Sequence, residues 1–186
     1  GGWTTCNVAP SPKPGQDRLW TFQSIAHGAD FISYFRWRTC TFGTEIYWHG
    51  ILDYNNKDNR RLAEIKRIHE EMRRVEQVAG AKYAAKVAIA RDYDNEWDGE
   101  NDVWHGPLND ASLANWFTAA EVTHTPFDFV NIAYPELTAQ DLSQYELIIY
   151  PHATIATEKI AGLLKEYVQN GGSVLMGARS GYKDIE

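Results

Sequence analysis

The stretch Tyr145-Glu-Leu-Ile-Ile-Tyr150 and the following Thr157-Glu-Lys-Ile-Ala-Gly-Leu-Leu-Lys-Glu-Tyr-Val-Gln169 decide the fold. The first is short and nearly all apolar, which is typical of a strand buried in a parallel sheet. The second has helical spacing and is followed by Gly171-Gly172, a helix-ending signal. Ser173–Ala178 is then predicted to be another strand. The helix is expected to turn these residues inward: Ile160, Leu163, Leu164, Tyr167 and Val168.

The same alternation extends toward the N-terminus. Lys86–Arg91 and Phe127–Ile132 are predicted strands, and between them lie an acidic loop through Pro107 and a helix over Asp110–Val122. The inward face of that helix is expected to hold Leu113, Trp116, Phe117 and Ala120. Strands that alternate with helices indicate a parallel sheet with helices on both faces. Residues 84–186 are therefore expected to form a flavodoxin-like three-layer α/β/α domain, truncated because Gly177–Glu186 leads out of a strand without a following helix.

The first 80 residues contain too few elements for a domain of their own. A helical pattern opens at Pro14-Gly-Gln16 and is expected to close at Gly28, and Phe31–Trp37 is predicted to be a buried parallel strand. Residues 39–57 are expected to form a long functional loop, and a helix then runs from a cap at Asp58 or Asn59 to Gly80. A single strand lacks hydrogen-bonding neighbours, so we expect the chain to begin within a larger α/β domain.

Composition is that of a folded globular protein, with 44% hydrophobic and 23% charged residues. Aromatic residues make up 13%, and four of the seven Trp lie within the first 48 residues. Such enrichment suits a sugar-binding cleft and also a well-packed core. No apolar run reaches the length of a membrane span. Cys6 and Cys40 form neither a disulfide framework nor a metal spacing, so they do not fix the compartment; a cytoplasmic location is favoured.

The net charge of −7 is unevenly distributed, because residues 1–90 carry 13 Lys/Arg against 9 Asp/Glu and residues 91–186 carry 5 against 16. A nucleic-acid partner would need a basic surface. The basic residues of 60–74 alternate with Glu64, Glu70, Glu71 and Glu76, which favours a solvated helix face. We therefore expect neither nucleic acid nor membrane as a partner.

Candidate site residues gather between residues 35 and 49. Arg36 and Arg38, at the end of the predicted strand, are equally consistent with binding a carboxylate and with ordinary ion pairs to loop acids. Glu45, in an aromatic loop with His49 after it, is of a type that accepts sugar hydroxyls, although a capping Glu and a structural His are the simpler interpretation.

The spacing of His, Cys and acidic residues gives little support for a metal site or a cysteine nucleophile. The six His residues share no zinc spacing, and no Cys follows Cys40, which excludes a cysteine nucleophile in the second half. The acidic run from Asp92 to Asp102 lacks the pattern of a calcium loop, so a solvated loop is favoured. No metal and no cofactor are expected.

Several linked motifs resemble the β-galactosidases of glycoside hydrolase family 42, and the resemblance covers essentially the whole chain. In the first half the motifs are Gly2-Trp3, Pro14-Gly-Gln16, Arg18-Leu-Trp20, Ile25-Ala-His-Gly-Ala-Asp30, Tyr34-Phe-Arg-Trp-Arg-Thr39, Phe42-Gly-Thr-Glu45 and Trp48-His-Gly-Ile-Leu-Asp53. In the second half they are Ala88-Ile-Ala-Arg-Asp-Tyr-Asp94, Leu142-Ser-Gln-Tyr-Glu-Leu147, Gly171-Gly-Ser-Val-Leu-Met-Gly177 and Arg179-Ser-Gly181.

The resemblance implies a fold and an assembly. Residues 1–80 would be the last segment of a catalytic (β/α)8 barrel, and residues 84–186 would be most of a flavodoxin-like, amidotransferase-like trimerisation domain. The full-length parent would be a homotrimer. This division agrees with the truncation expected from the pattern of elements.

The resemblance also implies retaining hydrolysis of terminal β-D-galactosyl residues, with one carboxylate as acid/base and one as nucleophile. Both would precede Gly1, so no catalytic residue is assigned and the chain alone is expected to be inactive. The resemblance implies that the substrate-binding residues of this chain are Trp3, Phe35, Glu45, Trp48 and His49. The family has a His shortly after the Glu, and whether Trp48 or His49 faces the sugar stays open. The alternative function is a non-catalytic association or carbohydrate-binding module.

Overall fold

The computed structural model describes residues 11–104, 106 and 108–184. The chain forms two compact units, Gly1–Tyr83 and Ala84–Glu186, each of which is described separately.

The first unit is built on two helices, α1 (Gln16–Ala26) and α2 (Arg60–Met72), which pack against each other. Asn59 caps α2 by accepting a hydrogen bond from the backbone N–H of Leu62, and it is one of the two residues that the sequence offered as the cap. Glu71 joins the two helices because it accepts hydrogen bonds from Arg18 of α1 and from Arg67 of α2. The hydrogen bond from Arg18, followed by that from Arg67, lowers the pKa of the Glu71 carboxyl.

Two expectations for this unit need correction. The predicted helix to Gly80 ends at Met72, and a 3₁₀ helix, η1 (Arg73–Val78), continues from it. The predicted strand Phe31–Trp37 is wrong: these residues form no strand, and beside them the structure has an isolated parallel bridge between Arg38 and Leu52. A strand needs a hydrogen-bonded neighbour along its length, and within the described residues only residues 51–52 offer backbone partners there.

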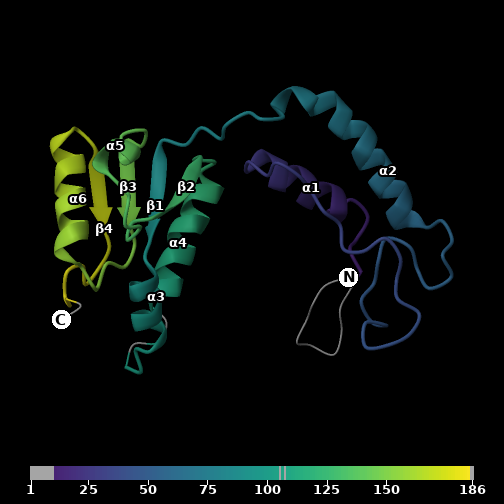
Figure 1. Cartoon of the computed structure of the whole chain (residues 1–186), viewed down its shortest axis with the longest axis horizontal. Helices are drawn as coiled ribbons and strands as arrows, with labels where there is room; N and C mark the ends of the chain where they lie inside the picture. The colour runs from purple at the N-terminus through teal and green to yellow at the C-terminus, as the bar shows by residue number, and fades with distance from the viewer. Residues whose placement is uncertain (1–10, 105, 107, 185–186) are drawn as a thin grey trace. The chain divides into compact units, whose positions relative to one another are not determined.

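The second unit contains one parallel sheet of four strands, β1 (Val87–Arg91), β2 (Phe127–Asn131), β3 (Leu147–Tyr150) and β4 (Ser173–Met176). Their order is β2-β1-β3-β4 (Figure 1). Val87 is in register with Phe127 on one side and with Leu147 on the other. The central strands are the most deeply buried, and Ala88, Ile89 and Ile148 have no more than 1% of their surface exposed.

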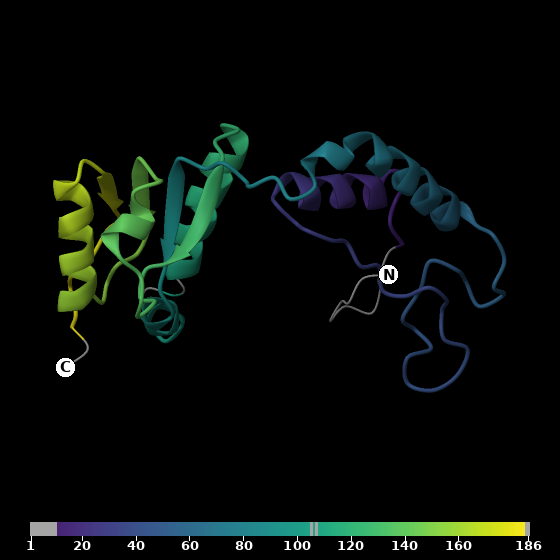
Figure 2. The ribbon, with the colours of Figure 1, turned by 45° about the horizontal axis from the view of Figure 1, so that its top comes forward.

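Four helices accompany the sheet: α3 (Tyr93–Glu100), α4 (Leu108–Val122), α5 (Ala139–Leu142) and α6 (Glu158–Gln169). In Figures 1 and 2 the strands lie between α4 and α6. Helix α3 packs with α4, and α5 packs with α6. Because strand–helix–strand connections are right-handed, the chain winds outward in opposite directions from β1 and from β3, giving helices on both faces. This is the predicted three-layer architecture.

Three details of the second unit differ from the sequence-based expectations. The acidic stretch after β1 is not a solvated loop, since residues 93–100 form α3 with Asp92 as its cap. Val168 is 48% exposed rather than inward, whereas Ile160, Leu163, Leu164 and Tyr167 are buried. Phe117 is 41% exposed but still packs its ring against Phe127 and Phe129.

Candidate functional site

The candidate site is a loop, residues 40–49, held at its base by two short backbone segments. The N–H of Ile51 donates to the carbonyl of Arg36 at 2.7 Å, and that of Leu52 donates to the carbonyl of Trp37 at 2.8 Å. The N–H of Thr39 returns a bond of 2.9 Å to the carbonyl of Leu52. The two ends of the loop are therefore fixed side by side.

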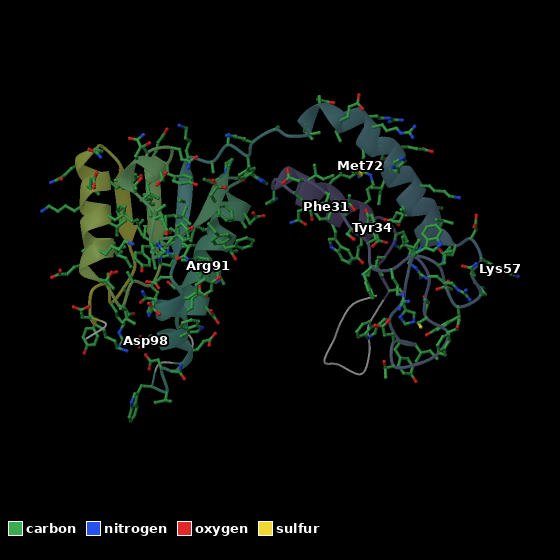
Figure 3. The ribbon with its side chains drawn as sticks, viewed as in Figure 1. Phe31, Tyr34, Lys57, Met72, Arg91 and Asp98 are labelled. Atoms are coloured by element: carbon green, nitrogen blue, oxygen red, sulfur yellow. The ribbon has the colours of Figure 1, made fainter. Side chains whose placement is uncertain are left out.

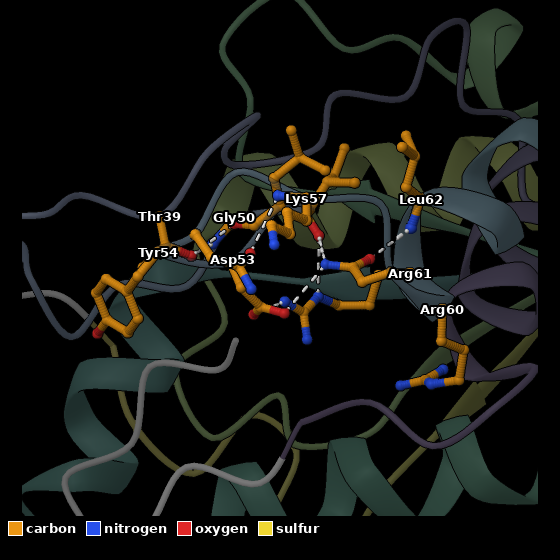
Figure 4. A network of polar contacts seen from close by, with 12 residues as sticks. Thr39, Gly50, Asp53, Tyr54, Lys57, Arg60, Arg61 and Leu62 are labelled. Atoms are coloured by element: carbon orange, nitrogen blue, oxygen red, sulfur yellow. Dashed lines mark hydrogen bonds and ion pairs between the residues drawn. The ribbon is translucent and has the colours of Figure 1, made fainter.

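A buried threonine and a glycine close this base (Figure 4). The hydroxyl of Thr39, a residue that is only 1% exposed, accepts from the N–H of Gly50 at 2.9 Å and donates to the carbonyl of Leu52 at 2.8 Å. A β-carbon on Gly50 would lie 2.5 Å from the Arg36 carbonyl oxygen. Only glycine fits this close approach between backbones.

A polar network ties the base of the loop to the first turn of α2 (Figure 4). The Asn59 amide donates to the Ile51 carbonyl at 2.9 Å and to Asp53 at 3.2 Å. Arg61 donates to the Ile51 carbonyl at 3.2 Å and forms an ion pair with Asp53. The hydrogen bond from Arg61 lowers the pKa of the Asp53 carboxyl. The start of the helix thus fixes the loop through Asn59, which the sequence predicted only as a possible helix cap, and through Arg61, to which the sequence assigned no such role.

Within the loop, Glu45 forms an ion pair with Arg36, at 2.6 Å from Nη1 to Oε2. The Arg36 guanidinium also lies over the ring of Phe35, 5.7 Å from its centroid. Phe35 in turn meets Trp48 edge-to-face, with centroids 5.9 Å apart. The arrangement joins one carboxylate, one guanidinium and two aromatic rings on a partly exposed surface.

The structure brings together three of the five residues predicted to bind substrate. Arg36 contacts both Glu45 and Phe35, and Phe35 contacts Trp48. His49 instead lies against Tyr54, with centroids 6.0 Å apart. Trp3 lies outside the described residues.

The sequence left two roles open for Arg36, the binding of a carboxylate and an ordinary ion pair with a loop acid; in the structure its partner is a loop acid, Glu45. The position of Arg36 inside the aromatic run Tyr34-Phe-Arg-Trp was the available signal. Figure 3 shows Tyr34 near α1, where its hydroxyl hydrogen-bonds to the Thr21 hydroxyl.

The second unit has a buried polar cluster at the carboxyl ends of β1 and β3. The Tyr150 hydroxyl donates to Asp92 at 2.8 Å, and burial raises the pKa of Tyr150. The Asn95 side chain accepts from the Ile155 N–H at 2.8 Å and lies 3.0 Å from the Ile155 carbonyl. A cavity of about 10 Å³ beside this cluster has room for about one water.

Arg91 lies at the end of β1 (Figure 3) and adjoins this cavity. It pairs with Glu96 through two hydrogen bonds of 2.8 and 2.9 Å. Across the part of the chain that the structure describes, no group of three or more His, Cys, Asp or Glu side chains is placed to hold a metal ion. Within the same residues, no helix is both long and apolar enough to cross a membrane.

Comparison with family models gives two matches. A model described as Beta-galactosidase matches residues 2–75, and one described as Beta-galactosidase trimerisation domain matches residues 85–186.

Curated relatives and solved structures agree with these matches. Beta-galactosidase Bga of Halorubrum lacusprofundi is 34% identical over 180 residues, which are 95% of this chain and 24% of the relative. Beta-galactosidase LacZ of Heyndrickxia coagulans is 29% identical over 98% of this chain and 27% of the relative. The solved structure of a catalytic mutant of a GH42 β-galactosidase from G. stearothermophilus superposes with a TM-score of 0.86, at 27% identity, over 97% of this chain and 26% of that chain. The chain thus spans about a quarter of the length of the relatives it matches.

Proposed function

The chain belongs to the glycoside hydrolase family 42 β-galactosidases, and from this membership we propose that it forms part of an enzyme that hydrolyses terminal β-D-galactosyl residues. Its first unit is the last segment of a (β/α)8 barrel and its second unit is a flavodoxin-like domain. The acid/base and nucleophile carboxylates belong to the part of the barrel that precedes Gly1. The chain supplies substrate binding rather than bond cleavage.

The observation that carries the proposal is the contact of Glu45 with Arg36 beside the aromatic pair Phe35 and Trp48. A sugar ring presents hydroxyls at its rim and C–H groups on its faces. Carboxylate oxygens accept hydrogen bonds from hydroxyls, and aromatic rings pack against C–H faces. Glu45 is proposed as the hydroxyl acceptor, with Phe35 and Trp48 as the aromatic wall.

For the choice between Trp48 and His49, the ring contacts support Trp48 as the residue that faces the sugar. Trp48 contacts Phe35, whose neighbour Arg36 holds Glu45. His49 contacts Tyr54, whose hydroxyl donates to the Ile46 carbonyl. His49 is therefore proposed to stabilise the loop through Tyr54 rather than to contact the sugar. Trp48→Ala is expected to raise KM for an aryl β-galactoside about tenfold or more, and His49→Ala is expected to raise it less.

Residues 85–186 are proposed to assemble the full-length enzyme as a homotrimer, because they match the trimerisation domain model. Sedimentation equilibrium of the longer protein tests this assembly, with a trimer mass expected and a concentration-independent monomer contradicting it. The same match favours the second candidate function, an association module without catalysis. A longer protein that sediments as a trimer but hydrolyses no galactoside would favour that candidate.

The experiment that tests the site is Glu45→Gln in the longer protein that carries these residues. Loss of a charge-assisted hydrogen bond to substrate is expected to lower kcat/KM for 4-nitrophenyl β-D-galactoside by about ten- to a hundredfold. Glu70→Gln is the matched control, since Glu70 is an exposed residue of α2. Equal activity of the Glu45→Gln variant and the wild type would refute the assignment.

A further inference from the structure

We propose that Arg36 is a positioning residue that holds the Glu45 carboxylate in the orientation that accepts a sugar hydroxyl. This inference rests on the proposed function and adds to it a residue that touches the substrate only through Glu45.

Glu45 needs such a partner because of where it lies. Residues 41–47 form bends and turns without helix or strand, and the Glu45 side chain is 45% exposed. A long, exposed side chain loses conformational entropy when it is fixed for binding. Among the described residues, the cation in contact with this carboxylate is Arg36, and the 2.6 Å separation is that of a short, charge-assisted hydrogen bond.

Arg36 is itself held from two directions. Its carbonyl accepts the 2.7 Å hydrogen bond from Ile51, at the clamped base of the loop. Its guanidinium lies over the ring of Phe35 at 5.7 Å, a cation–π distance. The Arg36 side chain therefore connects the carboxylate to the aromatic wall and fixes one relative to the other.

The exposure of the pair argues against a purely structural role. The two side chains are 31% and 45% exposed, and ion pairs at this exposure contribute little to folding. The guanidinium engages Oε2, while Oε1 makes no hydrogen bond to any described residue. A carboxylate held by one oxygen retains acceptor capacity on the other, which suits a hydroxyl of the substrate.

The test uses the longer protein with Arg36→Gln and Arg36→Lys. Rates are compared between 4-nitrophenyl β-D-galactoside and its 3-, 4- and 6-monodeoxy analogues. A site built to bind one hydroxyl discriminates strongly against the analogue that lacks it. The hydroxyl that Glu45 binds is identified with Glu45→Gln. This variant should lose the preference for the parent galactoside over the one analogue that lacks that hydroxyl. Arg67→Gln is the control, because Arg67 forms a comparable pair with Glu71 on α2, at 2.9 Å.

Arg36→Gln is expected to reduce the wild-type preference for the parent galactoside over that analogue by about tenfold, and Arg36→Lys, which keeps the charge, by less. Arg67→Gln should leave the preference unchanged. An active wild type whose Arg36 variants lose rate equally on all substrates would overturn the inference alone. A wild type without activity on the parent galactoside would overturn the proposed function, and the inference with it.

Discussion

A β-carbon placed on Gly50 would lie 2.5 Å from the carbonyl oxygen of Arg36, and the next nearest atoms are also backbone, those of Arg38. The base of the site loop therefore closes only because residue 50 has no side chain. Backbone atoms on both sides leave no flexible group to move aside.

Gly50→Ala is accordingly expected to force the two segments apart and destabilise the first unit by about 1–3 kcal/mol. Because Glu45 lies on the displaced loop, kcat/KM of the longer protein should fall at least tenfold. Urea denaturation and galactoside kinetics check the two effects. Unchanged values for both would show that the loop base has more space than the structure gives it.

At Gly162 the same change to alanine is expected to have the opposite effect on stability. Gly162 lies inside α6, and an added β-carbon would meet nothing within 4 Å. Alanine is the better helix former, so the variant should gain about 0.5–1 kcal/mol in free energy of unfolding. The urea midpoint of the second unit is the measurement, and a lowered midpoint would contradict the prediction.

The second unit could be predicted from the sequence because its signals are local. Ile160, Leu163, Leu164 and Tyr167 recur at helical spacing, and all four are buried on α6. Helix α3 was missed because its residues are acidic and have no apolar stripe. The available signal was Asp92, which caps the helix through the N–H of Asp94 and is followed by acidic residues in the first turn.

The first unit was harder because its structure depends on contacts distant in sequence. Phe31–Trp37 has the composition of a strand, yet strand formation requires a partner backbone, and within the described part of the first unit a bridge between Arg38 and Leu52 is all that forms. The pairing of Arg36 with Glu45 crosses an irregular loop, where no periodicity fixes the register. The sequence shows which residue types the loop contains, whereas the contacts between them depend on the folded structure.

Asn95→Ala is expected to destabilise the second unit by about 1–3 kcal/mol, because it removes one of the hydrogen bonds to the buried Asp92 and leaves the part-buried N–H and carbonyl of Ile155 without the Asn95 side chain as partner. Asn115→Ala, at an exposed position of α4, is the control and should change stability by less than about 0.5 kcal/mol. Chemical denaturation followed by far-UV circular dichroism compares them. Equal effects of the two substitutions would mean that the Asn95 contacts contribute nothing.

Alkaline pH should destabilise the second unit through Tyr145. Burial, followed by the hydrogen bond to Asp128, raises the pKa of Tyr145 to about 12. An unfolded chain releases this proton near pH 10, so between about pH 10 and 12 the folded state binds more protons and stability falls as pH rises. Tyr145→Phe should flatten this decline when the free energy of unfolding is measured from pH 8 to 11. An unchanged slope would contradict the assignment.

The most direct measurement is hydrolysis of 4-nitrophenyl β-D-galactoside by the longer protein, with the first sugar product followed by proton NMR. We expect β-galactose to appear before its anomer, as retention requires, and we expect the 186-residue chain alone to release no nitrophenol. Absence of hydrolysis by the longer protein, initial release of α-galactose, or turnover by the 186-residue chain alone would contradict the proposed division between cleavage and substrate binding.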